Sequence, residues 1–294
     1  KNFTTIKHKY RMLSLGNSYS KEDIEDFETR IKKLVEHELE YICELKYDGA
    51  SVNLLYENGE LIKGLTRGDG AQGDDITKNL KTINSIPLKL NSKSFPEKFE
   101  IRGEIIILTE SFKALNKNRE LNGESLFMNP RNTASGSVKL LDSKEVARRP
   151  LEFFLYSIVS NDLTINEHSN LLNLARDMGF KVPKYDKVVK SIDLVKEYIK
   201  HWNKERENLP FEIDGIVIKV NNIDYQKKIA LNTMIENPAI TLKVIIKRTL
   251  SFFLIDPVAH VYYFHNWNVD DGPYYKSAAH KMWLLPRICY SLFI

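Results

Sequence analysis

Apolar residues in this chain gather in short runs bounded by polar residues, and this pattern predicts strands. One run begins at Leu39 and closes at Gly49. Two others are separated by Asn58-Gly59, a strong signal for a hairpin turn. The predicted strands are residues 39–49, 51–56, 61–66, 99–108, 151–158 and 211–220.

Other segments carry apolar residues three and four positions apart, which predicts amphipathic helices. Ser20-Lys-Glu-Asp23 resembles a capping box at the start of the first helix, and Thr109 is expected to cap another. The predicted helices are residues 21–37, 109–119, 171–178 and 195–202, and a polar loop is predicted from residue 129 to 137.

Hairpins as well as helices separate the predicted strands, and this favours an α+β fold with mainly antiparallel sheets and flanking helices. A doubly wound sheet is not expected. No G-x-G-x-x-G sequence follows a predicted strand, which argues against a Rossmann dinucleotide site.

Composition adds few constraints. The 294 residues can form one large domain or two smaller ones, and 43% hydrophobic with 28% charged residues is an ordinary globular balance. A net charge of +4 permits a polyanionic partner without demanding one. Cys43 and Cys289 are too few for a disulfide framework. No apolar run reaches the roughly 20 residues of a membrane span, so a cytoplasmic protein is expected.

The sequence Glu44-Leu-Lys46-Tyr-Asp48-Gly49 closes the first strand and is the strongest candidate for chemistry. Alternation along a strand would place Lys46 and Asp48 on one face. A lysine amine can attack phosphorus and hold the product as a phosphoramidate, provided that burial or nearby cations lower its pKa. The alternative is a surface Lys/Asp pair beside a turn glycine.

Two further features could belong to a ligand site. Three glycines lie within Gly68–Gly73 and would let the backbone approach a ligand, although a mobile loop has the same composition. Charged residues also interrupt apolar strands at Arg102, Glu104 and Lys219, where burial without partners is costly. The floor of a pocket would explain Arg102 and Glu104, and so would a strand that crosses the edge of a sheet.

Several segments, in this order and spacing, resemble the adenylation domain of bacterial-type NAD-dependent DNA ligases over roughly residues 5–245. They are Met12–Leu15, Glu44–Gly49, Thr66–Asp75, Arg102–Glu104, Asn129–Asn132 and Asp214–Lys219. K-x-D-G and D-G-x-x-I-K occur in all covalent nucleotidyltransferases, whereas T-R-G-D-G and N-P-R-N are far more specific to the NAD-dependent branch.

This resemblance implies that Lys46 attacks the α-phosphorus of NAD, releases nicotinamide mononucleotide and carries AMP. Arg67, Lys219 and Lys243 would surround the phosphates, lower the pKa of Lys46 and stabilise charge at phosphorus. Asp48 would orient the lysine or bind near the ribose and metal. Magnesium is the expected metal, with no protein ligand named for it.

The resemblance also implies ligands for the base and the ribose. Glu44 and the backbone near Ser14 and Leu15 would contact adenine. Tyr156 would stack on the adenine ring. Glu104 would accept a hydrogen bond from a ribose hydroxyl.

Nicked double-stranded DNA is the implied partner, and its 5′-phosphate would receive the AMP. Arg131 and Lys139 would bind nick phosphates. The family has arginine where Lys139 stands, and lysine cannot make the same bidentate contact. A monomer is favoured.

Residues 1–247 are expected to form the adenylation domain and residues 248–294 an aromatic-rich tail. Pro238–Lys243 resembles the family's final lysine motif, with two residues apparently missing before Ala239. The family's nicotinamide-binding domain, zinc, helical-hairpin and BRCT modules are not recognised. We therefore expect this chain to bind AMP, to adenylate poorly from NAD and hardly to seal nicks.

Two other functions fit part of the pattern. One is an enzyme that uses ATP or GTP through the same lysine, although Ala50-Ser51 stands where ATP-dependent ligases favour an arginine. The other is a non-catalytic nucleic-acid-binding remnant, which predicts salt-sensitive DNA binding without nucleotide turnover.

Overall fold

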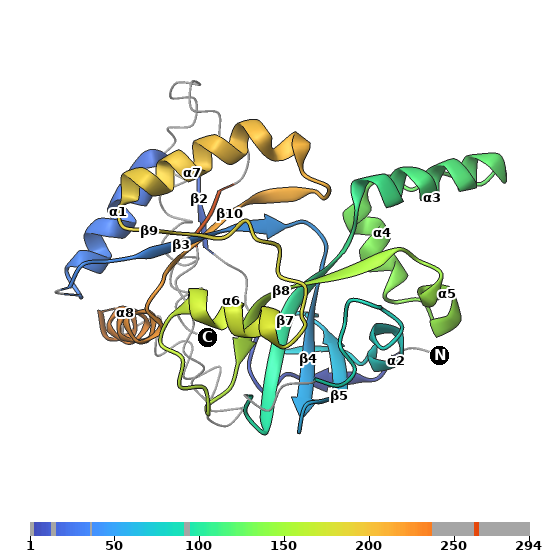
Figure 1. Ribbon diagram of the computed structural model, residues 1–294, viewed down its shortest axis with the longest axis horizontal. Helices are drawn as coiled ribbons and strands as arrows, with labels where there is room; N and C mark the ends of the chain where they lie inside the picture. The colour runs from blue at the N-terminus through green and yellow to red at the C-terminus, as the bar shows by residue number, and fades with distance from the viewer. Residues whose placement is uncertain (1–2, 13–15, 36, 91–94, 237–261, 265–294) are drawn as a thin grey trace.

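A computed structural model describes residues 3–12, 16–35, 37–90, 95–236 and 262–264 of the chain. Its strands form a five-stranded sheet, a four-stranded sheet and one small pair, with helices around them (Figure 1). The strands are β1 (Thr5–Lys7), β2 (Gly16–Ser18), β3 (Tyr41–Tyr47), β4 (Ala50–Glu57), β5 (Glu60–Thr66), β6 (Gln72–Asp74), β7 (Lys98–Ile107), β8 (Leu151–Val159), β9 (Lys187–Val189), β10 (Ile213–Val220) and β11 (Tyr262–Phe264).

Eight α-helices and one short 3-10 helix complete the described part of the chain. They are α1 (Lys21–Lys32), α2 (Thr77–Leu80), α3 (Thr109–Leu121), α4 (Pro130–Ser137), α5 (Ser143–Ala147), α6 (His168–Asp177), α7 (Ile192–Glu205), η1 (Arg206–Asn208) and α8 (Ile223–Glu236). No described helix is both long and apolar enough to cross a membrane.

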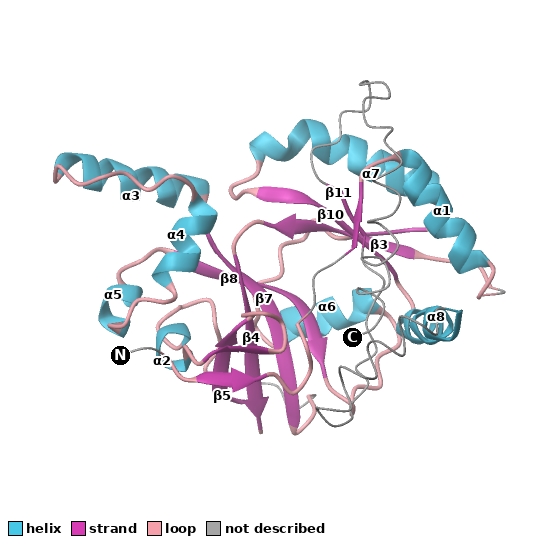
Figure 2. Ribbon diagram, turned by 180° about the vertical axis from the view of Figure 1, so that it is seen from behind, coloured by secondary structure: helices cyan, strands magenta, loops and turns pink. Residues whose placement is uncertain are grey.

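The five-stranded sheet has the order β2-β11-β10-β3-β9, and α1 and α7 lie on one of its faces (Figure 2). Apolar residues of these helices pack with Tyr41, Cys43 and Leu45 of β3 in one core cluster. Ile42, on the opposite face of the same strand, belongs to a different cluster. Alternation along β3 therefore divides its side chains between two cores.

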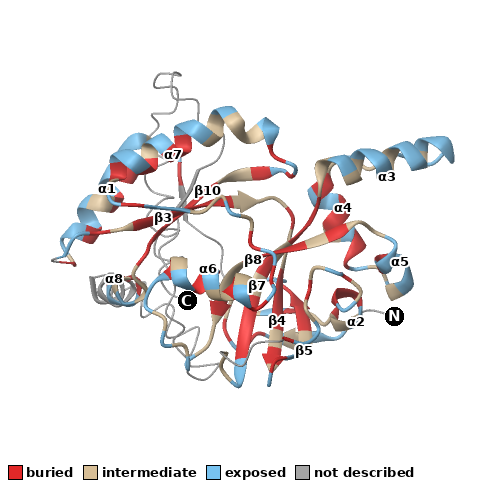
Figure 3. Ribbon diagram, viewed as in Figure 1, coloured by how far each residue is buried: buried red, intermediate tan, exposed pale blue. Residues whose placement is uncertain are grey.

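The four-stranded sheet has the antiparallel order β5-β4-β7-β8. Its strands share one core cluster with residues of α2, α4, α5 and α6. Much of the two central strands, β4 and β7, is buried (Figure 3). Because β7 lies between β4 and β8, the alternative in which Arg102 and Glu104 sit on a strand at the sheet edge is excluded.

The α+β fold with mainly antiparallel sheets is confirmed, as are all six predicted strands, with ends that differ by a few residues. Asn58 (φ 50°) and Gly59 (φ 76°) adopt the positive φ angles that a tight hairpin requires. The capping box is also present, since Ser20 accepts from Asp23 N and the Asp23 carboxylate accepts from Ser20 N.

Two helix predictions are wrong in detail, and one predicted loop is a helix. α1 ends at Lys32 rather than near residue 37, and Val35 belongs to the core just beyond it, with its N–H donating to the Ile31 carbonyl at 3.1 Å. Thr109 is the first residue of α3 and not its cap. The expected loop at 129–137 is helix α4, which Asn129 caps and Pro130 begins, the residue types that favour a helix start.

The predicted boundary between an adenylation domain and a tail at residue 247 lies outside the described residues. Within the predicted tail, only Tyr262–Phe264 is described. This short strand pairs antiparallel with β10 and parallel with β2.

Candidate active site

Glu44 and Lys46 lie on the face of β3 that carries Ile42, because side chains two residues apart point the same way. This face is turned away from α1 and α7. Gly49 follows at the point where the chain passes closest to β7. A Cβ atom there would stand 2.1 Å from the Ile105 carbonyl oxygen, so only glycine fits.

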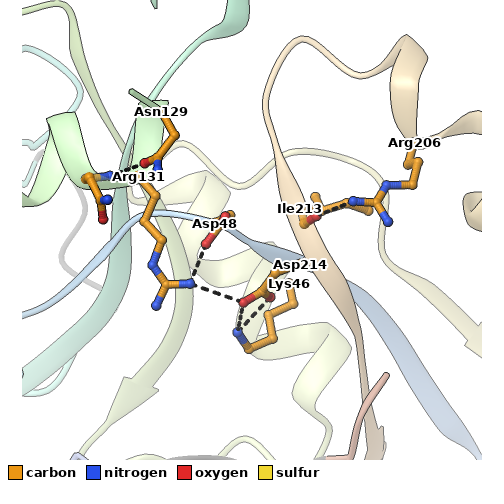
Figure 4. Close-up of polar contacts among 8 residues, drawn as sticks. Lys46, Asp48, Asn129, Arg131, Arg206, Ile213 and Asp214 are labelled. Carbon is orange, nitrogen blue, oxygen red and sulfur yellow. Dashed lines mark hydrogen bonds and ion pairs between the residues drawn. The ribbon is translucent and has the colours of Figure 1, made fainter. Parts of the chain in front are cut away.

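Asp214 reaches Lys46 from a β-bulge in the neighbouring strand. The pairing of β10 with β3 shifts between Ile213 and Gly215, and Asp214 is the extra residue. Both of its carboxylate oxygens lie 2.7 Å from Lys46 Nζ (Figure 4). The Lys46 side chain is 28% exposed and the Asp214 side chain 14%. The pair is therefore largely shielded, although part of the Lys46 side chain stays exposed.

Arg131 extends this network from α4 (Figure 4). Its guanidinium lies 2.7 Å from Asp48 Oδ1 and 3.5 Å from Asp214 Oδ2. Asp48 and Lys46 therefore belong to one polar cluster, in agreement with the prediction that their side chains lie on the same face. The cluster holds two carboxylates and two cations from three separate segments of the chain.

A second cluster lies on the same face of β3. Lys219 Nζ is 2.7 Å from Glu44 Oε1 and 2.9 Å from His168 Nε2, and His168 Nε2 is 3.1 Å from Glu44 Oε1. All three side chains are buried. Burial raises the pKa of Glu44, but Lys219 and His168 outweigh it and hold that pKa below its ordinary value.

Glu44 Oε1 has an unusual environment for a buried carboxylate oxygen. Lys219 lies within ion-pair distance, yet no described residue gives Oε1 a well-directed hydrogen bond. A buried acceptor in this state is costly unless a ligand completes it. A ligand that reached this oxygen would find an acceptor beside the Lys219 ammonium.

Glu104, Ser51 and Tyr156 form a third group on the four-stranded sheet. Ser51 pairs with Glu104 across β4 and β7, and its hydroxyl lies 2.8 Å from the Tyr156 hydroxyl. Tyr156 stands at a bulge in β8, between the partners of Arg102 and Gly103. Burial raises the pKa of Glu104 to about 8, against the opposing effect of Lys46 and Arg131. The positive charge of Lys46 therefore lowers the pKa of Glu104, although burial outweighs this effect.

We expect Glu104→Gln to change the pH dependence of stability. The pKa of Glu104 rises from 4.5 to about 8 on folding, so the native state keeps a proton that the unfolded state loses in this window. The wild-type free energy of unfolding should fall as pH rises from about 5 to 8, by at most about 1.4 kcal/mol per pKa unit. The glutamine variant should lack this decline. Urea unfolding of both proteins across this range is the measurement, and parallel pH profiles would contradict the expectation.

The glycine-rich loop between β5 and β6 is tied to the N-terminal segment. His8 N donates to Ala71 O at 3.0 Å, and Met12 N donates to Gly70 O at 2.8 Å. The buried His8 ring contacts the Arg67 carbonyl through Nε2 at 3.1 Å. Arg67 itself is exposed, and its charge acts on Tyr156. These contacts favour a positioned loop over a mobile one.

The remaining predicted site residues are placed less fully. Lys139 is exposed and lies 3.2 Å from Asp74 Oδ2, so it does not join the Arg131 cluster through any contact in the described residues. Ser14, Leu15 and Lys243 lie outside the described residues.

Sequence reasoning missed two residues of these clusters. Asp214 stands in the quoted D-G-x-x-I-K motif, but only the bulge reveals its contact with Lys46. His168 carries no local signal and meets Lys219 from a distance of 51 positions in the chain. Arg206, whose guanidinium donates to the Ile213 carbonyl at 3.3 Å, also lies beside the strand that carries Asp214 (Figure 4).

Magnesium is not supported by these side chains alone. The described residues contain no group of three or more potential metal ligands. The two carboxylates beside Lys46, Asp48 and Asp214, are ion-paired with Arg131 and Lys46. Magnesium binding therefore stays a prediction.

Comparisons with known proteins agree with the motifs. The model of a family described as the NAD-dependent DNA ligase adenylation domain matches residues 1–244. A DNA ligase from Christiangramia forsetii is 54% identical over 229 residues, covering 78% of this chain and 34% of that protein. A DNA ligase from Flavobacterium psychrophilum is 52% identical over 244 residues, covering 83% of this chain and 36% of that protein.

Similarity to solved structures is low. An archaeal ATP-dependent RNA ligase is 13% identical with a TM-score of 0.42, covering 72% of this chain and 45% of that chain. The assignment therefore depends on sequence. This chain spans about a third of the length of the curated relatives it matches. Because the family model covers most of its residues, the chain belongs to the NAD-dependent DNA ligase adenylation domain family.

Proposed function

We propose that this chain forms lysyl-AMP from NAD on Lys46 and passes AMP to the 5′-phosphate of a DNA nick. The observation that carries the proposal is the Lys46 amine near the end of β3, held by both oxygens of Asp214 on a side chain that is 28% exposed. A structural surface lysine would not need a bulge residue from another strand to hold it.

In the first step the Lys46 nitrogen attacks the α-phosphorus of NAD. A phosphorus–nitrogen bond forms, the bond to the bridging oxygen breaks, and nicotinamide mononucleotide leaves with that electron pair. The nitrogen must first give up a proton, because the ion-paired ammonium has no lone pair. Asp214 keeps Nζ in a fixed place until the nucleotide arrives.

In the second step an oxygen of the 5′-phosphate attacks the same phosphorus and Lys46 leaves as the amine. Arg131, half-exposed beside Asp48, is placed to bind a phosphate that approaches from solvent. A guanidinium suits this role because its planar fork matches phosphate oxygens. The contact of Lys139 with DNA stays a prediction, as does the contact of Arg67 with the phosphates of NAD.

The base would lie at the buried cluster. Glu44 Oε1 can accept from the exocyclic amine of adenine, and the Lys219 ammonium beside it can donate to a ring nitrogen. Because Lys219 contacts Glu44, it could bind the base as well as the phosphates, the role predicted for it from the sequence. Tyr156 would stack on the ring and Glu104 would bind the ribose.

The test is covalent labelling of the purified chain with adenylate-labelled NAD, beside labelled ATP and labelled GTP. We expect amine-linked label that is labile in acid and stable in alkali, from NAD alone. Label from ATP or GTP and none from NAD would favour the alternative nucleotidyltransferase. No label from any nucleotide, together with salt-sensitive DNA binding, would favour the non-catalytic alternative.

A further inference from the structure

His8 lies where the N-terminal segment packs on the glycine-rich loop between β5 and β6. The residue is only 8% exposed, and its ring Nε2 lies 3.1 Å from the Arg67 carbonyl oxygen. A carbonyl oxygen can only accept, so Nε2 must carry the proton in this contact. The other ring nitrogen, Nδ1, is buried and has no hydrogen-bond partner among the described residues. A neutral ring with its proton on Nε2 fits both nitrogens.

The hydrogen bond from His8 is not needed to satisfy the Arg67 carbonyl. Gly70 N already donates to the same oxygen at 3.0 Å. A phenylalanine ring would fill a similar space without leaving a buried nitrogen unsatisfied, which is costly. Burial lowers the pKa of His8 and the charge of Arg102 lowers it further, although the bond to Arg67 opposes both. What the histidine adds is therefore a second, directional contact to one carbonyl.

The backbone of Arg67 is held on both sides of its Cα atom. Its N–H donates to the Ser51 carbonyl at 3.1 Å, and its own carbonyl accepts from His8. Because peptide groups are planar, holding both of them sets φ and ψ and thus the direction of the side chain. Arg67 is exposed. Burial raises the pKa of Tyr156 to about 12, and the charge of Arg67 is among those that oppose this rise. The guanidinium therefore acts toward the group formed by Tyr156, Ser51 and Glu104.

We propose that His8 is a positioning residue that fixes the backbone of Arg67 and thereby holds the Arg67 guanidinium toward the phosphates of the bound dinucleotide. The inference deepens the proposed function and rests on the role of Arg67 in it. The loop closes tightly around the ring. A Cβ atom on Gly73 would stand 3.1 Å from His8 Nε2 and 1.8 Å from the Thr66 carbonyl oxygen. The imidazole therefore has little room to leave the Arg67 carbonyl.

The test is single-turnover adenylation of the full chain from labelled NAD, with His8 and Arg67 changed separately and together. His8→Phe keeps the ring but loses the donor, and the rate should fall about tenfold, the effect of one hydrogen bond. In the Arg67→Ala background, His8→Phe should change the rate by about twofold or less, because no guanidinium is left to position. His8→Gln should restore most of the rate, since its amide can donate to the same carbonyl.

The matched control is His201→Phe, a change of an exposed histidine on α7, which should adenylate at the wild-type rate. An equal fall from His8→Phe in both backgrounds would overturn the inference and leave the formation of lysyl-AMP intact. So would a His8→Gln variant as slow as His8→Phe. Arg67→Ala at the wild-type rate would remove the role of Arg67 and the inference with it. A wild type that takes no label from NAD would instead contradict the proposed function itself.

One measurement does not depend on how the variants fold. Nitrogen-15 NMR of the histidine rings in the wild type distinguishes the two neutral tautomers. We expect His8 to carry its proton on Nε2. A neutral ring with its proton on Nδ1 would overturn the inference, because Nε2 could then not donate to the Arg67 carbonyl.

Discussion

Lys46→Arg should abolish covalent adenylation while leaving the fold intact. A guanidinium can still pair with Asp214, so the variant should unfold at nearly the wild-type denaturant concentration. It stays protonated at any accessible pH and offers no lone pair to phosphorus. Label from NAD should therefore fall to background. Gel labelling with adenylate-labelled NAD measures this loss.

The matched control is Lys113→Arg, a change of an exposed lysine on α3 that pairs only with Glu110 in the described structure. It should label like the wild type. Label retained in Lys46→Arg would show that another residue carries AMP.

Asp214→Asn should have the next largest effect. Asparagine keeps the shape of the side chain but removes the charge that holds Lys46 Nζ and faces Arg131. A small misplacement of a reacting atom can cost about 100-fold in rate, so we expect a loss of roughly that size in single-turnover adenylation. Folding stability should fall only modestly, because asparagine keeps the shape of the side chain and solvent can reach the 28% exposed Lys46 side chain.

Asp224→Asn provides the control for this charge change. Asp224 lies on α8 and pairs with Lys227, with 56% of its side chain exposed. Its variant should adenylate at the wild-type rate. If Asp214→Asn also does so, Asp214 does not position the nucleophile.

Local patterns were enough to predict most of the fold. Alternating residues and the Asn58-Gly59 turn specify the β4–β5 hairpin through contacts between near neighbours in the chain. The prediction of a loop at Asn129–Ser137 could have been avoided from the local sequence. Asn129 before Pro130 is a helix-start signal, but the polar composition of the segment suggested a loop. Predictions of this kind fail when composition is weighed above capping chemistry.

The site was predictable only where a motif carried it. Lys46, Asp48 and Glu44 follow from one short segment and the resemblance. The contact of Asp214 with Lys46 depends on a bulge in pairing across 168 positions, and His168 reaches Lys219 from another element. No local periodicity reports such contacts. They arise when two strands and a helix are packed together.

The most direct test of the central claim is peptide mapping of the adenylated chain by tandem mass spectrometry, after incubation with NAD. We expect AMP on the peptide containing Glu44–Gly49, with fragment ions that place it on Lys46. AMP on any other residue would contradict it.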